Sequence, residues 1–195
     1  MFDQGFVPPM PASHHPPHIY LDDTWYMVTA ATRGRSRLLK DQSSKALVRD
    51  NMASRNAGIE IRAWVILDDH DHVLLKTHNT ESLPAFIRQL HGRTSFELNT
   101  RDGERGRQVW HNDWDTCIRT EIDLWTRFNY IHHNPVKHGY VTHPENWELS
   151  SLGWFLEHEG REWVKDAFRR YPVVSFTDRA DRFHSVARDP QPDAG

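Results

Sequence analysis

The chain contains only one cysteine, Cys117, among its 195 residues. A single cysteine can form neither an internal disulfide nor a cysteine zinc cluster, which fits a reducing compartment. The sequence also lacks an apolar run of the roughly 18 residues that a membrane span needs. It does not open with the basic-then-apolar pattern of a signal peptide. We therefore expect a cytoplasmic protein with no membrane partner.

An excess of positive charge is missing as well, because the formal net charge is -3. This balance gives no support to a protein that coats nucleic acid by charge alone. Local basic groups remain, and the clearest one combines Arg33, Arg35, Arg37 and Lys40. Such runs form solvated faces more often than phosphate-binding sites, and at this point both interpretations stay open.

The length fits one domain with extensions at both ends. Residues 1–18 are rich in proline and histidine and predict a flexible arm. Residues 19–150 form the expected main domain. Residues 151–176 carry apolar side chains at near-helical spacing and predict a helical extension, whereas residues 177–195 predict a loose tail.

Two histidines one residue apart stand between two apolar runs in the stretch WVILDDHDHVLLK, residues 64–76. In a strand, His70 and His72 share one face while Asp71 points to the other, and the two histidine Cα atoms lie about 6.5 to 7 Å apart. Two imidazoles at that distance can bind one metal ion. With 14 histidines in the chain, this spacing can also arise by chance.

The surrounding pattern predicts a mixed fold of class α+β. We expect a strand over 24–32, a helix from about 36 or 41 to 56, and a hairpin turning at 68–69 whose second strand begins with the histidines. A helix capped by Ser82 and running to about 98 follows, then a charged loop over 101–108 and a short strand at 109–110. This order is that of a ferredoxin-like βαββαβ core with an antiparallel sheet, in which the first and third strands are central.

A third helix is expected over about 120–133, and Pro135 is expected to kink or end it. Its apolar stripe should consist of Ile118, Ile122, Trp125 and Phe128, packed on the sheet.

A polar stripe on the same helix places Tyr130 and Asn134 side by side. A tyrosine in such a position is usually a half-buried packing residue. At the end of the helix, His132 is typical of a surface residue, with a role as proton acceptor as the alternative.

Taken together, DDHDHVLL (68–75), WHNDWDTCIRTEIDLWTRFNYIHHNPVKHGYV (110–141) and NWELSS (146–151) resemble the single-tyrosine HUH transposases, in particular the REP-associated tyrosine transposases. The resemblance covers about residues 19–151. It implies a metal-dependent single-strand DNA endonuclease and strand transferase, which cleaves hairpin-forming repeat DNA through a 5′-phosphotyrosine intermediate.

The resemblance also implies site residues. Tyr130 would be the nucleophile, and His70, His72 and Asn134 would bind Mg²⁺ or Mn²⁺. Asp71 departs from the family pattern, whose middle residue between the histidines is usually hydrophobic or aromatic. A tyrosine hydroxyl has an ordinary pKa of about 10, so its proton must be removed or its phenolate stabilised before it attacks phosphorus.

The expected partner is single-stranded or hairpin DNA, and the expected location is the cytoplasm, in association with the nucleoid. Whether the chain acts as a monomer or a homodimer stays undecided. Basic side chains are candidates for DNA contacts: Arg33, Arg35, Arg37, Arg88, Arg93, Arg127, Lys137 and His138. Two alternatives remain: a hairpin-binding protein of this fold without cleavage, and a metal-dependent phosphodiesterase that uses water as its nucleophile.

Overall fold

The computed structural model describes residues 20–54 and 58–173. The predicted flexible arm and loose tail fall outside these residues. In chain order the elements are β1 (Thr24–Thr32), the 3-10 turn η1 (Arg33–Arg35), α1 (Gln42–Ala53), β2 (Ile59–Ile66), β3 (His70–Thr77), α2 (Ser82–Asp102), β4 (Trp110–Ile118), α3 (Glu121–Lys137), η2 (Pro144–Asn146), α4 (Leu152–His158) and α5 (Arg161–Arg170).

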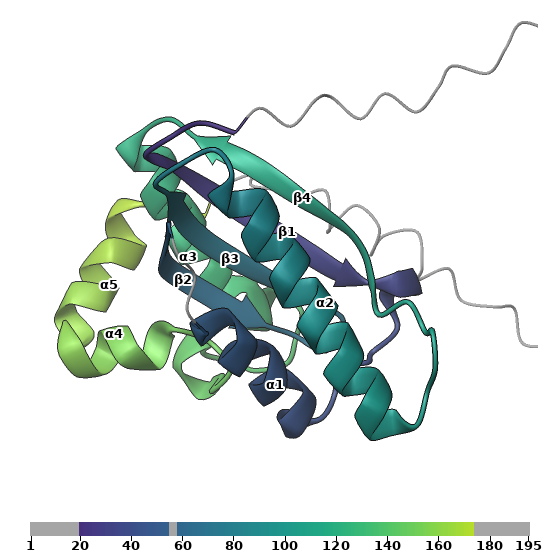
Figure 1. Ribbon diagram of the computed structural model, residues 1–195. Helices are drawn as coiled ribbons and strands as arrows, with labels where there is room; N and C mark the ends of the chain where they lie inside the picture. Colours follow the sequence, from purple (N-terminus) through teal and green to yellow (C-terminus); the bar gives the residue numbers. More distant parts are fainter. Residues whose placement is uncertain (1–19, 55–57, 174–195) are drawn as a thin grey trace, which may run out of the picture.

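The four strands form one antiparallel sheet in the order β2-β3-β1-β4. This is the strand order of a ferredoxin-like core, and β1 and β3 are central as predicted. Helices α1 and α2 cover one face of the sheet and α3 lies behind the other (Figure 1). None of the helices in the described part of the chain has the length and apolar character needed to cross a membrane.

Alternation along β3 divides the core into two layers. Val73 and Leu75 pack in the cluster beneath α1 and α2, whereas Leu74 packs in the cluster beneath α3. By the same period of two, His70 and His72 point toward α3 and Asp71 points away from it. The central strand thus holds the two histidines on the face that the tyrosine-bearing helix covers.

The bounds of α1 and α2 differ from the sequence-based expectation. Helix α1 begins after Asp41, whose carboxylate accepts a hydrogen bond from the Ser44 amide at 2.8 Å, so the start at residue 36 was wrong. Ser82 does not cap α2, because its hydroxyl donates instead to Asn79 Oδ1 and the capping position is Glu81. Helix α2 also runs past residue 98 to Asp102, over the first two residues of the expected loop, and ends at Gly103 with a left-handed φ of 71°.

Strand β4 is longer than the two residues expected at 109–110. It runs to Ile118 because nearly every residue pairs with β1, from Thr32↔Trp110 to Trp25↔Ile118. Its alternation was obscured by Asp113 and Asp115, which are polar although they point toward the α2 face.

The predicted apolar stripe of α3 was partly wrong. Ile118 belongs to β4, and Ile122 is 69% exposed in the first turn of the helix. Trp125 and Phe128 do pack in the core. The helix also passes through Pro135 to Lys137, because a missing amide near the end of a helix costs only one hydrogen bond.

Beyond α3, helices α4 and α5 form a small layer at one side of the sheet (Figure 1). Phe155 and Val164 are buried against Phe128 of α3. The residues after α3 therefore complete the core on the side of the tyrosine.

The turn between β2 and β3 forms polar contacts with α1 and with the chain that follows β1. The Asp68 carboxylate accepts from Lys45 of α1 at 2.7 Å and also from Arg37. Its main-chain oxygen accepts from the Leu39 amide at 2.9 Å, and that of Asp69 accepts from the Thr32 amide at 2.9 Å. The turn is therefore held by α1 and by the chain that follows β1.

We expect Lys45→Met to lower the free energy of unfolding by about 3 kcal/mol, because the side chains of Lys45 and Asp68 are only 4% and 5% exposed and the change leaves a buried carboxylate with one fewer cation. Urea unfolding followed by circular dichroism measures the difference. Arg49→Met, on the exposed side of the same helix, is the matched control and should change stability by less than about 1 kcal/mol. Equal effects of the two changes would contradict the role assigned to the turn.

Candidate metal and nucleophile site

His70 and His72 lie side by side at the beginning of β3. Their ring centroids are 5.1 Å apart with the planes at 86°, and the residues are 1% and 0% exposed. A buried imidazole needs a partner for each ring nitrogen, because leaving a polar atom unpaired inside the protein is costly. The partners of the two rings therefore define what the site can bind.

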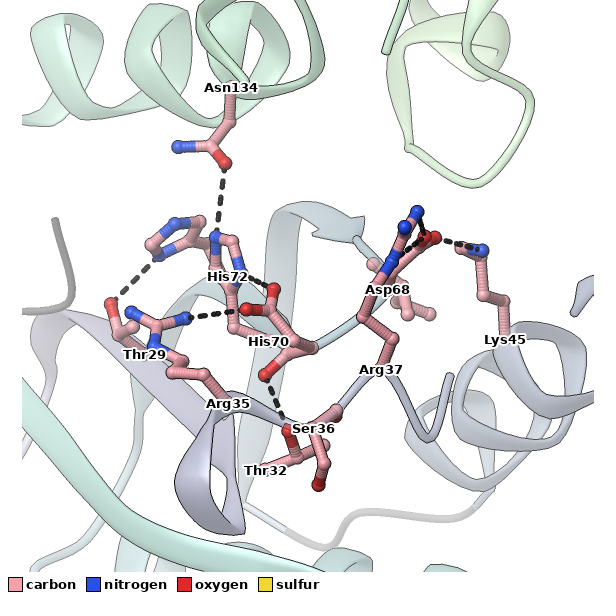
Figure 2. Close-up of polar contacts among 12 residues, drawn as sticks. Thr29, Thr32, Arg35, Ser36, Arg37, Lys45, Asp68, His70, His72 and Asn134 are labelled. Atoms are coloured by element: carbon pink, nitrogen blue, oxygen red, sulfur yellow. Dashed lines mark hydrogen bonds and ion pairs between the residues drawn. The ribbon is translucent and has the colours of Figure 1, made fainter. Parts of the chain in front are cut away.

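His70 is oriented by the residue before it. Its Nδ1 lies 2.6 Å from Asp69 Oδ1, and because a carboxylate only accepts hydrogen bonds, Nδ1 carries the proton. The other oxygen of Asp69 forms an ion pair with Arg35 at 3.7 Å. Arg35 belongs to η1, the 3-10 turn after β1, and Figure 2 shows it extending toward His70. In the neutral ring, Nε2 is left as the atom with a lone pair.

His72 is held from the neighbouring strand. Its Nδ1 lies 2.8 Å from the Thr29 hydroxyl on β1. Burial, together with the charges of His70 and His138, lowers the pKa of His72 well below its usual value of 6.5. The ring is therefore neutral at neutral pH, which is the form that can bind a metal ion.

Asn134 faces the histidines from α3 (Figure 2). Its Oδ1 lies 3.3 Å from His70 Nε2, and its Nδ2 is buried with no hydrogen-bond partner among the described residues. When the His70 ring is neutral, both facing atoms present lone pairs. Two acceptors at this distance repel each other unless a proton or a cation lies between them.

The chemistry of these donors fits a divalent ion. Two atoms that each lie about 2.1 Å from one ion are roughly 3.0 to 3.4 Å apart at ordinary coordination angles, which matches the separation of His70 Nε2 and Asn134 Oδ1. Among the described residues, no group of three or more His, Cys, Asp or Glu side chains is arranged to hold a metal. The amide oxygen of Asn134 would complete the ligand set, and imidazole with amide oxygen suits Mn²⁺ or Mg²⁺.

Tyr130 lies one helical turn before Asn134 on α3. It is 1% exposed, and its ring centroid is 5.3 Å from that of His72. Lys137 Nζ lies 4.9 Å from the centre of the same ring. The tyrosine also lines a cavity of about 520 Å³, together with Lys137 and residues of the C-terminal helices. The structure therefore brings the predicted nucleophile and ligands together within one chain.

Two other polar side chains of α3, Asn129 and His132, form hydrogen bonds to the C-terminal part of the chain. Asn129 donates from Nδ2 to the main-chain oxygens of Ala167 and Tyr171, at 2.8 and 2.6 Å, which fixes the helix against α5. His132, expected at the surface, is fully buried with Nε2 2.9 Å from the Ser151 hydroxyl. Burial lowers the pKa of His132 to about 3. This histidine therefore packs as a neutral ring and joins α3 to the start of α4.

Asp71, the unusual middle residue of the motif, lies on the opposite side of the sheet from the histidines. It is 1% exposed, and its Oδ2 has no hydrogen-bond partner in residues 20–54 and 58–173. Burial and the nearby Asp113 carboxylate raise the pKa of Asp71 well above its usual range. Its effect on the site is therefore through packing of β3.

The predicted DNA contacts fall into three groups. Arg35, Lys137 and His138 lie at the site, since the His138 ring centroid is 5.1 Å from that of His70. Arg88 and Arg93 belong to α2, which covers the opposite face of the sheet, so the structure does not bring them to the histidines.

The other arginines in that prediction are joined to nearby side chains. Arg37 is bound to Asp68, Arg127 to Asp123 and Arg33 to Gln108.

Sequence reasoning missed two residues that orient the histidines, Asp69 and Thr29. Asp69 stands directly before His70, and a carboxylate beside a ligand histidine is a common arrangement at metal sites. That adjacency could have identified it. Thr29 carries no such signal, because only the strand pairing places it opposite His72.

Known proteins are similar to this chain in sequence or in fold. The family model described as "Transposase IS200 like" matches residues 21–134. A protein described as a REP-associated tyrosine transposase of Haemophilus influenzae is 36% identical over 48% of this chain and 58% of its own length. The chain thus spans less than two thirds of that relative.

A REP-associated tyrosine transposase of Escherichia coli is 27% identical over 66% of this chain and 76% of its own length. The solved structure of a REP-associated tyrosine transposase bound to a REP hairpin has the same fold. It superposes with a TM-score of 0.64 and 22% identity over 85% of this chain and 92% of that one.

We expect Asp69→Asn to weaken Mn²⁺ binding by roughly 10- to 100-fold, because an amide orients and polarises the His70 ring less than a carboxylate does. Isothermal titration calorimetry with MnCl₂ measures the change. Asp50→Asn, an exposed carboxylate on α1, is the control and should leave the affinity as it is. Equal Mn²⁺ affinity in the Asp69 variant and the unaltered chain would count against the assigned ligands.

Proposed function

Because the chain belongs to the IS200-like transposase family, we propose that it is a metal-dependent single-strand DNA endonuclease and strand transferase that acts on hairpin-forming repeat DNA. The observation that carries this proposal is the convergence of β3 and α3 on one point. His70 and His72 meet Asn134 there, and Tyr130 lies beside them.

Cleavage begins with Tyr130. Its phenolic oxygen attacks the scissile phosphorus, so that a bond to phosphorus forms while the bond to the 3′ oxygen breaks. The tyrosine loses its proton to water, and the departing 3′ oxygen takes one up. Lys137 Nζ, 4.9 Å from the ring centre, supports the phenolate by its positive charge. The product is a 5′-phosphotyrosyl link and a free 3′-OH.

A divalent ion held by His70, His72 and Asn134 would polarise the scissile phosphate and neutralise part of its charge. The two histidine side chains are already oriented before any ion binds. Asp69 and Thr29 fix the ring orientations of His70 and His72, and burial keeps the His72 ring neutral. Positions fixed in advance need no reorganisation during the reaction.

Strand transfer follows from the same chemistry run in reverse. The phosphotyrosyl bond keeps the phosphodiester's free energy, so a second 3′-OH can attack it and rejoin strands without ATP. Tyr130 is then released with its proton restored. Water would compete for the intermediate, but the side chain is 1% exposed and the metal ligands around it are buried.

The DNA substrate is inferred from the relatives and from local charge. Two relatives are named for their association with REP sequences, and the solved structure carries a REP hairpin. With a net charge of -3, this chain has no general attraction for DNA. Arg35, Lys137 and His138 instead concentrate positive charge or hydrogen-bond donors at the site.

A covalent adduct tests this function. Labelled hairpin DNA incubated with the protein and Mn²⁺ should give an SDS-resistant protein-DNA band, and Tyr130→Phe should abolish it because the attacking oxygen is gone. Tyr140→Phe is the matched control, since Tyr140 packs on Trp147 after the end of α3, and it should keep the band.

The two alternatives give different results in the same gel. Retarded DNA without any adduct in the unaltered protein would indicate a hairpin-binding protein without cleavage. Cleavage that persists in Tyr130→Phe would indicate a phosphodiesterase that uses water, and the proposed nucleophile would be wrong.

A further inference from the structure

Strand β2 forms one edge of the sheet in the described part of the chain, because the strand order is β2-β3-β1-β4. The chain after α3 covers part of its outer side. The Ile66 amide donates to the Leu149 main-chain oxygen at 2.9 Å, and the Ser151 amide donates to that of Trp64 at 3.0 Å. Residues 149–151 therefore lie along the second half of β2 as an added antiparallel strand would.

This cover stops where helix α4 begins. The chain turns into α4 at Leu152, and within residues 20–54 and 58–173 no strand pairs with the outer side of Ile59–Arg62. The N–H and C=O groups on the outer side of an edge strand can pair with another chain. The first half of β2 is thus a place where a further strand can be added.

A cavity of about 510 Å³ lies at this point, and its lining comes from α1, β2 and the chain around the start of α4 (Figure 1). Most of the lining is apolar. Met52 and Phe155 are 3% and 4% exposed, whereas Trp154 is 52% exposed. Ile61 joins these side chains from the edge strand itself. The cavity can therefore hold an apolar side chain of a strand that lies beside β2.

The two charged side chains that line the cavity are both arginines, Arg49 and Arg62. Arg62 forms no ion pair within the described residues, and its guanidinium carbon lies 6.0 Å from the centre of the Trp125 ring. Arg49 pairs with Asp50 at 2.8 Å, but these side chains are 47% and 66% exposed, so the pair contributes little. Positive charge is thus available for acidic groups of a ligand.

The cavity is separate from the metal and nucleophile site. Its lining includes neither the metal ligands nor Tyr130, and it includes none of the basic side chains placed at that site. Strand β3, which carries the histidines, pairs with the other side of β2. A molecule bound at the outer edge of β2 would therefore leave the proposed DNA site accessible.

We propose that the outer edge of Ile59–Arg62 and this cavity together bind an extended acidic segment of a partner protein by strand addition. The main chain of the segment pairs with β2, one apolar side chain enters the cavity, and carboxylates lie against Arg49 and Arg62. Main-chain hydrogen bonds give such binding its affinity, and pockets for alternate side chains give it specificity. The proposal does not depend on the proposed reaction on DNA, because it uses neither the metal ligands nor Tyr130.

The probe is a fluorescein-labelled synthetic peptide of about eight residues, which spans Ile59–Arg62 with room at both ends. Glutamate and threonine alternate along it, and the central residue is phenylalanine in one form and leucine in another. Fluorescence anisotropy with the full chain gives the dissociation constants. Two further forms carry N-methyl groups on alternate amides, one form on the odd positions and the other on the even positions.

We expect the acidic peptide to bind, and the same peptide with lysine in place of glutamate to bind at least about tenfold more weakly. One of the two N-methylated forms should lose binding and the other should keep most of it. The reason is that only every second amide of an added strand faces its neighbour.

Substitutions in the protein test the assigned side chains. Arg62→Glu should weaken binding of the acidic peptide roughly tenfold and strengthen that of the lysine peptide, because attraction and repulsion are exchanged. Trp154→Ala should weaken the phenylalanine peptide by a similar factor. Arg105→Glu, the same charge reversal at an exposed position after α2, is the control and should change neither affinity. Thermal unfolding followed by circular dichroism checks that each variant is folded.

Four results would overturn the proposal. If neither acidic peptide binds with a dissociation constant below about 1 mM, or if the two N-methylated forms bind equally, no strand is added at β2. If hairpin DNA displaces the peptide, the cavity belongs to the DNA-binding surface. If the unaltered chain sediments as a dimer that Arg62→Glu dissociates, a second copy of the chain covers this edge instead of a partner protein.

Discussion

The two adjacent carboxylates at the turn between β2 and β3 are the constraint on which the rest of this structure depends. Both are nearly buried, and a buried carboxylate is tolerated only with cations and hydrogen-bond donors around it. Asp68 takes these from Lys45 and Arg37, and Asp69 takes them from His70 and Arg35. The turn consequently fixes helix α1, the loop after β1 and the first metal-site histidine in one arrangement.

Polar groups occur inside this core because the site requires them there. His72 and Asn134 are fully buried, and a hydrophobic core would hold apolar side chains at those positions. The desolvation that makes them unfavourable for stability also keeps the His72 imidazole neutral. It excludes water from the place where charge would develop during cleavage. Burial of these polar groups thus reduces stability locally while it fixes their positions.

Some of this arrangement could be predicted from the sequence, and the reason is physical. The two-residue period of a strand places His70 and His72 on one face, and the order of elements makes their strand central; the structure confirms both. The geometry agrees with the pairing of Tyr130 and Asn134 on one helix face. Their catalytic and metal-binding roles remain predictions.

Other features depend on contacts that no local pattern reveals. Ile122 is apolar but exposed in the first turn of α3. The length of strand β4 was underestimated because Asp113 and Asp115 interrupt the apolar alternation. Thr29 becomes relevant only when β1 is paired with β3. Tertiary context overrides local preference at these positions.

The separation in sequence between the two halves of the site also determines when it can exist. His70 and Asn134 are 64 residues apart, and the hydrogen bond from the Trp64 amide to the Ser151 hydroxyl joins residues 87 apart. During synthesis from the N-terminus, the histidines emerge first, before the tyrosine and the helices that brace it. The proposed site is therefore not assembled in a growing chain, and the proposed cleavage activity begins only when α3 has folded onto β3.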